Sequence, residues 1–180
     1  MYGMVNRAIQ DMVERGHGPE VWEKIKERAD VDVDVFISSE GYPDEITYRL
    51  VGAASEELSI PAEQVLEAFG IHWVVKTAQE GYGDMLASNG TTLKEFLLNL
   101  PNFHARLSMI FPHLAPPDFV CMDEQEASVR MQYRSQRAGL GPFVRGLFLG
   151  LGQMYHTPVN VEQVMHKGRD GDHDEFIVRW

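Results

Sequence analysis

The sequence lacks several features that mark common classes of protein. It contains a single cysteine, Cys121, which excludes an internal disulfide and any zinc site or iron–sulfur cluster built on several thiolates. It has no apolar run long enough to cross a bilayer, and its first residues lack the basic stretch and apolar core of a secretory signal. We therefore expect a cytoplasmic protein in which any metal site uses histidine or carboxylate ligands.

Basic residues are also scarce. The 180 residues include 16 Lys or Arg against 27 Asp or Glu, which gives a formal net charge of -11. Nucleic-acid binding depends on cationic side chains that neutralise phosphates, so this balance argues against a nucleic-acid partner. The composition, 44% hydrophobic and 24% charged, is typical of a globular domain with a core large enough to enclose an apolar ligand.

Hydrophobic periodicity predicts helices through the first part of the chain. Apolar residues keep helical spacing from Val5, and Pro19, Pro43 and Pro61 each suit the first turn of a further helix. The stretch Val31–Ile37 alternates Val and Asp and is expected to be an extended linker. The first 60 residues are therefore predicted to form a helical subdomain.

The second part of the chain reads as helices followed by strands. Thr92 to Glu95 has the spacing of a capping box, and a further helix containing Phe103 and Leu107 is expected after it. Beyond Pro117 the expected elements are two strands, a helix and a hairpin of two more strands: Phe119–Met122, Val129–Ser135, Pro142–Tyr155, Val159–Met165 and Glu175–Trp180. The sequence therefore predicts an α+β fold with a small antiparallel sheet of about four strands.

A polar cluster stands out at the end of the second expected strand. If the strand continues, Tyr133, Ser135 and Arg137 share one face, because alternate residues of a strand point the same way. Two hydroxyls and a guanidinium in a row suit a ligand with two carboxylates, since Arg binds carboxylates with charge-assisted hydrogen bonds. Taken by spacing alone, such a row is more often a solvated strand face.

Histidine gives the second signal. His104 follows Phe103 on a segment expected to be a helix with a buried side, whereas His166 and His173 lie near an acidic, exposed hairpin. His104 is therefore the better candidate for a metal ligand. A single His in such a place is more often an ordinary core or edge residue.

The two signals together resemble the H-NOX family (haem–nitric oxide/oxygen binding), and the resemblance covers the whole chain. The segment around His104 is similar to the one that holds the family's proximal histidine, and the polar cluster matches the family's Y-x-S-x-R motif for haem propionates. The matching segments are the Met-x-Gly opening, Asn102–Arg106, Ala115–Pro117 and the Tyr133, Ser135, Arg137 motif.

The resemblance implies one domain, residues 1–180, with haem b enclosed between the helical subdomain 1–60 and a haem-holding part 61–180. It implies that His104 is the only protein ligand to the iron, that Tyr133, Ser135 and Arg137 bind the propionates, and that Pro117 presses on the porphyrin. These assignments fit the needs of haem, an apolar disc that takes an axial ligand and polar donors at one edge.

The resemblance also bears on which gas binds. Family members that bind O₂ place a tyrosine where this chain has Phe143 or, with one residue of loop difference, Pro142. Neither residue can donate a hydrogen bond. Trp73 aligns with the same distal pocket and carries an indole N–H, and Leu147 is also assigned to the haem site. We expect binding of NO and CO with little or no stable O₂ binding.

A sensor of this family performs no reaction of its own. The resemblance implies that NO weakens the bond from the iron to His104 and that the resulting shift acts on a signalling partner, which in the family is a histidine kinase, diguanylate cyclase, guanylate cyclase or chemotaxis protein. No membrane partner is expected.

Two other kinds of protein remain possible from the residues alone. A peroxidase-like or nitrite-reducing haem enzyme needs an acid–base group in the distal pocket, and only His72 beside Trp73 offers one. A haem-free carrier of an apolar ligand would use His104 and the polar cluster structurally. The glycines Gly146, Gly150 and Gly152 do not form a phosphate loop, because no Lys-Ser/Thr follows them. We expect them to permit close packing of their helix on haem or on the sheet.

Overall fold

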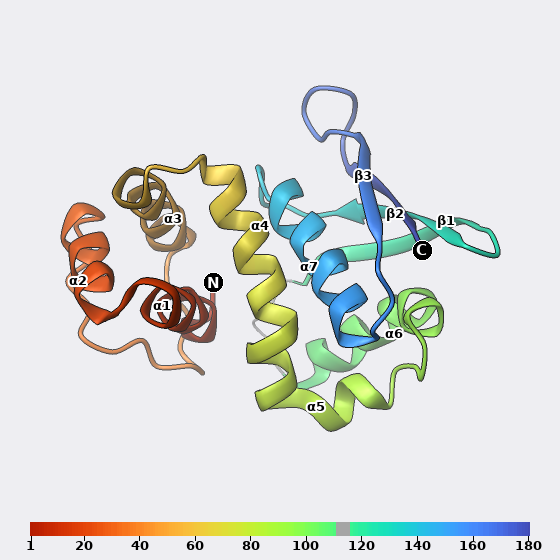
Figure 1. Ribbon diagram of the computed structural model, residues 1–180, viewed down its shortest axis with the longest axis horizontal. Helices are drawn as coiled ribbons and strands as arrows, with labels where there is room; N and C mark the ends of the chain where they lie inside the picture. The colour runs from red at the N-terminus through yellow and green to blue at the C-terminus, as the bar shows by residue number, and fades with distance from the viewer. Residues whose placement is uncertain (111–115) are drawn as a thin grey trace. The chain divides into compact units, whose positions relative to one another are not determined.

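The computed structural model describes residues 1–110 and 116–180, and it shows the predicted α+β fold (Figure 1). The chain divides into two compact units, Met1–Phe69 and Gly70–Trp180. The boundary falls within one helix, α4. In the described residues, no helix is both long enough and apolar enough to span a membrane.

The first unit is helical, as the periodicity predicted. Its helices are α1 (Gly3–His17), α2 (Pro19–Arg28), α3 (Asp44–Leu58) and the beginning of α4 (Ala62–His72). Pro19 lies at the first position of α2, where its missing N–H costs nothing. The predicted linker over 31–37 is confirmed, since it contains neither helix nor strand.

Gly3 explains the Met-x-Gly opening within this unit. A Cβ at Gly3 would lie 2.1 Å from the carbonyl oxygen of Ile37 and 2.8 Å from the ring of Tyr42. The Gly3 N–H donates to the carbonyl of Glu40 at 2.8 Å, which fixes this close approach of the linker. Only glycine fits here without moving backbone.

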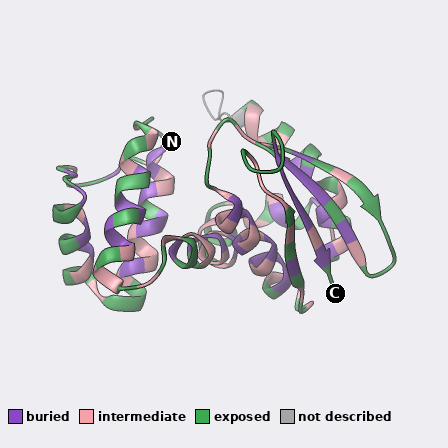
Figure 2. Ribbon diagram, turned by 90° about the horizontal axis from the view of Figure 1, so that it is seen from above, coloured by how far each residue is buried: buried purple, intermediate pink, exposed green. Residues whose placement is uncertain are grey.

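The second unit combines helices with one antiparallel sheet. Its elements are the π-helix η1 (Trp73–Ala78), α5 (Gln79–Ala87), α6 (Leu93–Ile110), β1 (Asp118–Glu124), β2 (Ser128–Arg134), α7 (Gly141–Met154), β3 (Asn160–Met165) and β4 (Asp174–Arg179). The strand order is β1-β2-β4-β3, so β2 and β4 are central. Figure 2 shows buried residues along these strands, where Val129, Met131, Phe176 and Val178 are fully buried.

Helix α7 packs closely against η1 and the end of α4. A Cβ on Gly70 would lie 2.2 Å from the carbonyl oxygen of Phe143, and one on Gly150 would lie 2.9 Å from the Cβ of Val74. The expectation that Gly150 packs closely on haem or the sheet is corrected here. Its close neighbours are Ile71 and Val74 of the α4–η1 segment, so the close approach is between two helical segments.

The expectation of two separate helices around residue 100 is wrong. Helix α6 runs from Leu93 to Ile110 with Pro101 inside it. Proline in a helix interior costs about 3 kcal/mol. Here, Leu97 and Leu100 before the proline and Phe103 after it are buried in one core cluster, and this shared burial outweighs the cost.

Candidate functional site

His104 lies in the second half of α6, on the side that packs against β1. Its ring stacks on Phe119 of β1, with centroids 5.2 Å apart and an interplanar angle of 10°. Phe103 meets the same imidazole at 5.8 Å and nearly edge-on. The imidazole is therefore held on two sides by aromatic rings.

This environment keeps His104 neutral. Burial lowers the pKa of His104 from 6.5 to about 4, although the charge of Asp118 acts in the opposite direction. Its Nδ1 is buried and has no hydrogen-bond partner among the residues that the structure describes. A neutral imidazole keeps a lone pair, so the side chain is suited to bind a metal ion at neutral pH.

Phe119 connects this histidine to the polar motif. Its ring lies 5.1 Å from that of Tyr133 on β2 and 6.0 Å from that of Phe148 on α7. The sequence analysis placed Phe119 in a strand but gave it no role in the site. The available signal was its position as the first apolar strand residue after Pro117.

The polar motif is not carried by a single strand, which corrects the expectation from spacing. Strand β2 ends at Arg134, where it still pairs with Asp118 of β1. Beyond it, the Oγ of Ser135 accepts the backbone N–H of Arg137 at 3.1 Å, so the chain turns instead of extending the ladder.

The alternation of burial continues through this turn. Tyr133 is buried, Ser135 and Arg137 are partly buried, and Arg134 and Gln136 are exposed. The three motif residues therefore share the protected side although only Tyr133 belongs to the strand. Because the Ser135 hydroxyl accepts from Arg137, its own proton stays available for a carboxylate.

The expected distal residues come from η1 and α7. Trp73 is the first residue of η1, and Phe143 and Leu147 lie one turn apart on α7; all three are partly buried. Trp73 and Leu147 pack against the same core cluster that contains Phe119 and Tyr133. The structure thus brings Trp73 and Leu147 to the core that contains Phe119, the residue on which His104 stacks.

Pro117 immediately precedes β1 and is partly buried. It is two residues before Phe119, the residue on which His104 stacks. Ala115, which belongs to the same motif, lies outside the described residues.

These residues fit haem. A neutral, buried imidazole with an unpaired nitrogen suits an axial ligand. Aromatic and aliphatic side chains supply the apolar surroundings, and the Ser135–Arg137 turn supplies hydroxyl and guanidinium donors for carboxylates.

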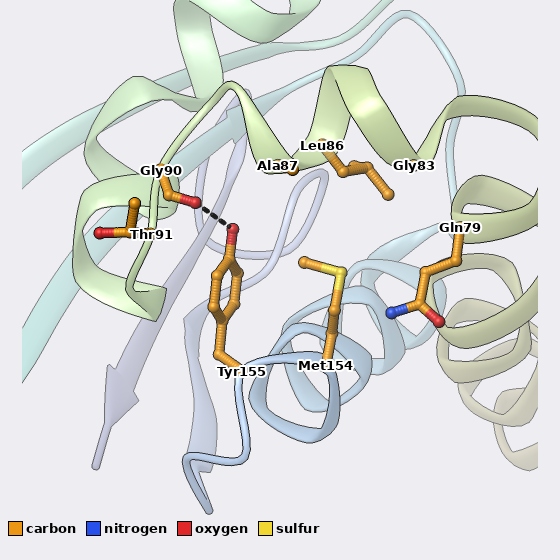
Figure 3. Close-up of a pocket in the computed structure, with 8 residues that line it drawn as sticks. All are labelled: Gln79, Gly83, Leu86, Ala87, Gly90, Thr91, Met154 and Tyr155. Atoms are coloured by element: carbon orange, nitrogen blue, oxygen red, sulfur yellow. Dashed lines mark hydrogen bonds between the residues drawn. The ribbon is translucent and has the colours of Figure 1, made fainter.

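A separate pocket lies between α5, the loop before α6 and the end of α7 (Figure 3). Its volume is about 460 Å³, and none of the expected site residues lines it. Tyr155 points its hydroxyl at the carbonyl of Gly90, to which it donates at 2.9 Å. The lining residues include no cation, so this pocket does not suit a ligand with two carboxylates.

Comparison with known proteins agrees with this chemistry. The family model described as Haem-NO-binding matches residues 2–163. Soluble guanylate cyclase gcy-31 of Caenorhabditis elegans is 26% identical over 90% of this chain and 23% of its own length. Soluble guanylate cyclase 89Db of Drosophila melanogaster is 25% identical over 81% of this chain and 22% of its own length. The chain thus spans less than a quarter of the length of these relatives.

Solved structures agree on the fold. An H-NOX protein from S. oneidensis, a mutant in the Fe(II) ligation state, has a TM-score of 0.90 at 19% identity and covers 99% of this chain and 95% of its own. An Fe(II) unliganded H-NOX protein from K. algicida has a TM-score of 0.86 at 23% identity, and the match covers 99% of this chain and 96% of that protein's chain. Because the family model matches residues 2–163, which is most of this chain, the chain belongs to the haem-NO-binding (H-NOX) family, whose members are haem-based gas sensor domains.

Proposed function

We propose that this chain senses NO through haem b held by His104. The observation that carries the proposal is the buried, neutral His104, whose Nδ1 lacks a hydrogen-bond partner among the described residues. An unsatisfied buried nitrogen costs free energy and calls for an explanation. Axial ligation, with the other residues of the site around the porphyrin, supplies one.

Each remaining residue has a role in this proposal. Tyr133, Ser135 and Arg137 would bind the haem propionates, and Pro117 would contact the porphyrin. Trp73, Phe143 and Leu147 would line the part of the pocket that receives the gas. Because Phe143 is no hydrogen-bond donor, NO and CO bind well there, while polarised O₂ gains little.

The signal passes through α6 and β1. When bound, haem would supply an iron atom that binds NO, and His104 would be its protein ligand. A change in how His104 is held would reach Phe119, on which its ring stacks, and Pro117 two residues earlier, so that α6 could shift against the β1 region. Such a change acts as a switch if a partner binds one arrangement better than the other.

The partner is a signalling protein in the cytoplasm. The curated relatives that match here are soluble guanylate cyclases, in which the matched segment is a minor part of the chain. A guanylate cyclase, histidine kinase, diguanylate cyclase or chemotaxis protein therefore suits this role. An H-NOX protein from S. oneidensis has been solved in the Fe(II)NO ligation state, which supports NO as the ligand.

The test compares purified wild-type protein with His104→Gly. We expect a haem absorption band in the wild type, loss of haem from His104→Gly, and recovery when imidazole is added, because the pocket remains while the axial ligand is missing. Unchanged haem content without imidazole would remove His104 from its role. Absence of haem from the wild type would favour the apolar-ligand carrier, and turnover with peroxide would favour an enzyme that uses His72.

A further inference from the structure

The hairpin between β3 and β4 reaches the turn that carries the propionate motif. The Nζ of Lys167 donates to the backbone carbonyl of Ser135. Ser135 is the residue whose Oγ accepts the N–H of Arg137. A residue 32 positions away in sequence therefore holds the first residue of this turn.

Lys167 is itself fixed by a buried carboxylate. Its backbone N–H donates to Oδ1 of Asp174 at 2.8 Å, and the side chain of Gln163 donates to the same oxygen at 2.8 Å. Asp174 is 7% exposed and pairs with Tyr133 across the sheet. The backbone of Lys167 is thus bonded to Asp174, which pairs with Tyr133, the first residue of the propionate motif.

Fixing Lys167 in this position costs conformational entropy that a freely moving surface lysine does not lose. A bond from an ammonium to a carbonyl is charge-assisted and stronger than a neutral one, which offsets that loss. The positive charge also stands beside the donors that face a carboxylate ligand in the proposed function.

We propose that Lys167 is a positioning residue for the propionate-binding turn. By holding the carbonyl of Ser135, it fixes the orientation of the Ser135 hydroxyl and the Arg137 backbone before haem arrives. This inference rests on the proposed haem site. It assigns to the β3–β4 hairpin a specific part in recognising the free carboxylates of the porphyrin.

The test uses three variants and two porphyrins. Lys167→Met keeps an unbranched side chain one atom shorter but removes the donors. Lys167→Arg keeps donors and charge, and Arg169→Met is the matched control. Arg169 lies on the same hairpin, and its guanidinium donates to its neighbour Asp170. The measurement is the rate at which haem passes to an excess of an apoprotein acceptor, for haem b and for its dimethyl ester.

We expect Lys167→Met to release haem b about tenfold faster than the wild type, as befits one charge-assisted hydrogen bond. Lys167→Arg and Arg169→Met should stay near the wild-type rate. With the dimethyl ester, whose carboxylates are blocked, Lys167→Met and the wild type should release at the same rate. Equal acceleration for both porphyrins would mean a general structural role and would overturn the proposal, as would equal acceleration by Arg169→Met.

A second readout needs no haem. In the apoprotein, amide hydrogen exchange at Arg137 should be faster in Lys167→Met than in Arg169→Met, because the N–H of Arg137 is protected only while the turn holds. Unchanged exchange would overturn the positioning role even if haem is bound. Faster exchange in a chain that binds no haem would instead leave the turn contact standing and reject the proposed function.

Discussion

At the scale of single residues, the site depends on side chains that each satisfy two requirements. Ser135 accepts a hydrogen bond that shapes its own turn and keeps a proton for a ligand. Phe119 is both a core residue of the sheet and the surface on which His104 stacks. A substitution at such a position changes both the local structure and the ligand contact. A variant of a neighbouring residue outside the proposed ligand contacts therefore serves as its control.

Arg137 and Arg134 form such a pair. We expect Arg137→Ala to release haem about tenfold faster, through loss of a charge-assisted contact to a propionate. Arg134→Ala should release it at nearly the wild-type rate, because Arg134 is exposed and donates to Asp172 at 2.7 Å and to Gln132 at 3.1 Å. The same transfer assay measures both variants. Equal losses in the two would count against the propionate assignment.

Phe143 decides the response to O₂. The reduced, haem-loaded protein should bind NO and CO but show no persistent spectrum of O₂ binding in air. Phe143→Tyr would strengthen O₂ binding by about 1–3 kcal/mol, roughly five- to a hundredfold, if its hydroxyl reaches the ligand. Absorption spectra of both proteins under each gas provide the measurement. Stable O₂ binding by the wild type would show that Trp73 or an ordered water donates the hydrogen bond.

At the scale of elements, the distal side of the site is set by the contact between α7 and the α4–η1 segment. The π-helix η1 follows α4 directly, and π-helical turns are frequently found at functional sites. Gly70 and Gly150 let the two backbones approach to a distance that side chains would prevent. The position of Trp73 relative to Phe143 and Leu147 therefore depends on these glycines.

Gly70→Ala should destabilise the protein by about 2–3 kcal/mol, because its Cβ would meet the backbone of Phe143 at 2.2 Å and cannot be relieved by a rotamer change. Gly52→Ala is the control, and its expected change in stability has the opposite sign. Gly52 is exposed inside α3, and a Cβ there meets nothing within 4 Å. We expect it to stabilise by about 0.5–1 kcal/mol. Urea unfolding of both variants measures the difference, and a neutral Gly70→Ala would mean that α7 moves away without cost.

The elements that the sequence predicted well are those specified locally. The hairpin was expected over 159–165 and 175–180, and β3 and β4 match it within one residue at nearly every end, because alternation and a glycine turn at Gly168 define it. The end of β2, the continuity of α6 through Pro101 and the role of Phe119 were missed. Each of these features depends on contacts between residues that are distant in sequence, and a local hydrophobic pattern carries no information about such contacts.

At the scale of the whole molecule, charged side chains of both signs pair around His173, at the start of β4. The Nδ1 of His173 lies 2.5 Å from Oδ1 of Asp172 and its Nε2 lies 3.0 Å from Oε1 of Glu175, and both nitrogens donate when the ring is protonated. Arg134 pairs with Asp172, and Arg130 with Glu175. The hydrogen bond to Asp172 is the largest cause that raises the pKa of His173 above 6.5, and the bonds from His173 and Arg134 lower the pKa of Asp172 to about 2.

These shifts predict how stability depends on pH. Because the folded-state pKa of His173 is raised, protonated His173 stabilises the fold fully below pH 6.5, and this contribution is lost as the pH rises through the raised value. Asp172 acts in the opposite sense: its contribution is present above pH 3.8 and is lost as the pH falls towards 2. The cluster is therefore strongest in mildly acidic solution.

His173→Gln tests this in the apoprotein. We expect the variant to be less stable than the wild type at about pH 6 and the difference to shrink by about pH 9, since the wild type then loses the same charge. Comparing variants cancels the contribution of His104, whose pKa of about 4 gives it the opposite dependence between pH 4 and 6.5. His17→Gln, an exposed position at the end of α1, is the control and should differ from the wild type equally at both pH values. Urea unfolding measures all three proteins, and a His173→Gln deficit that is the same at both pH values would show that the histidine acts by packing and not by charge.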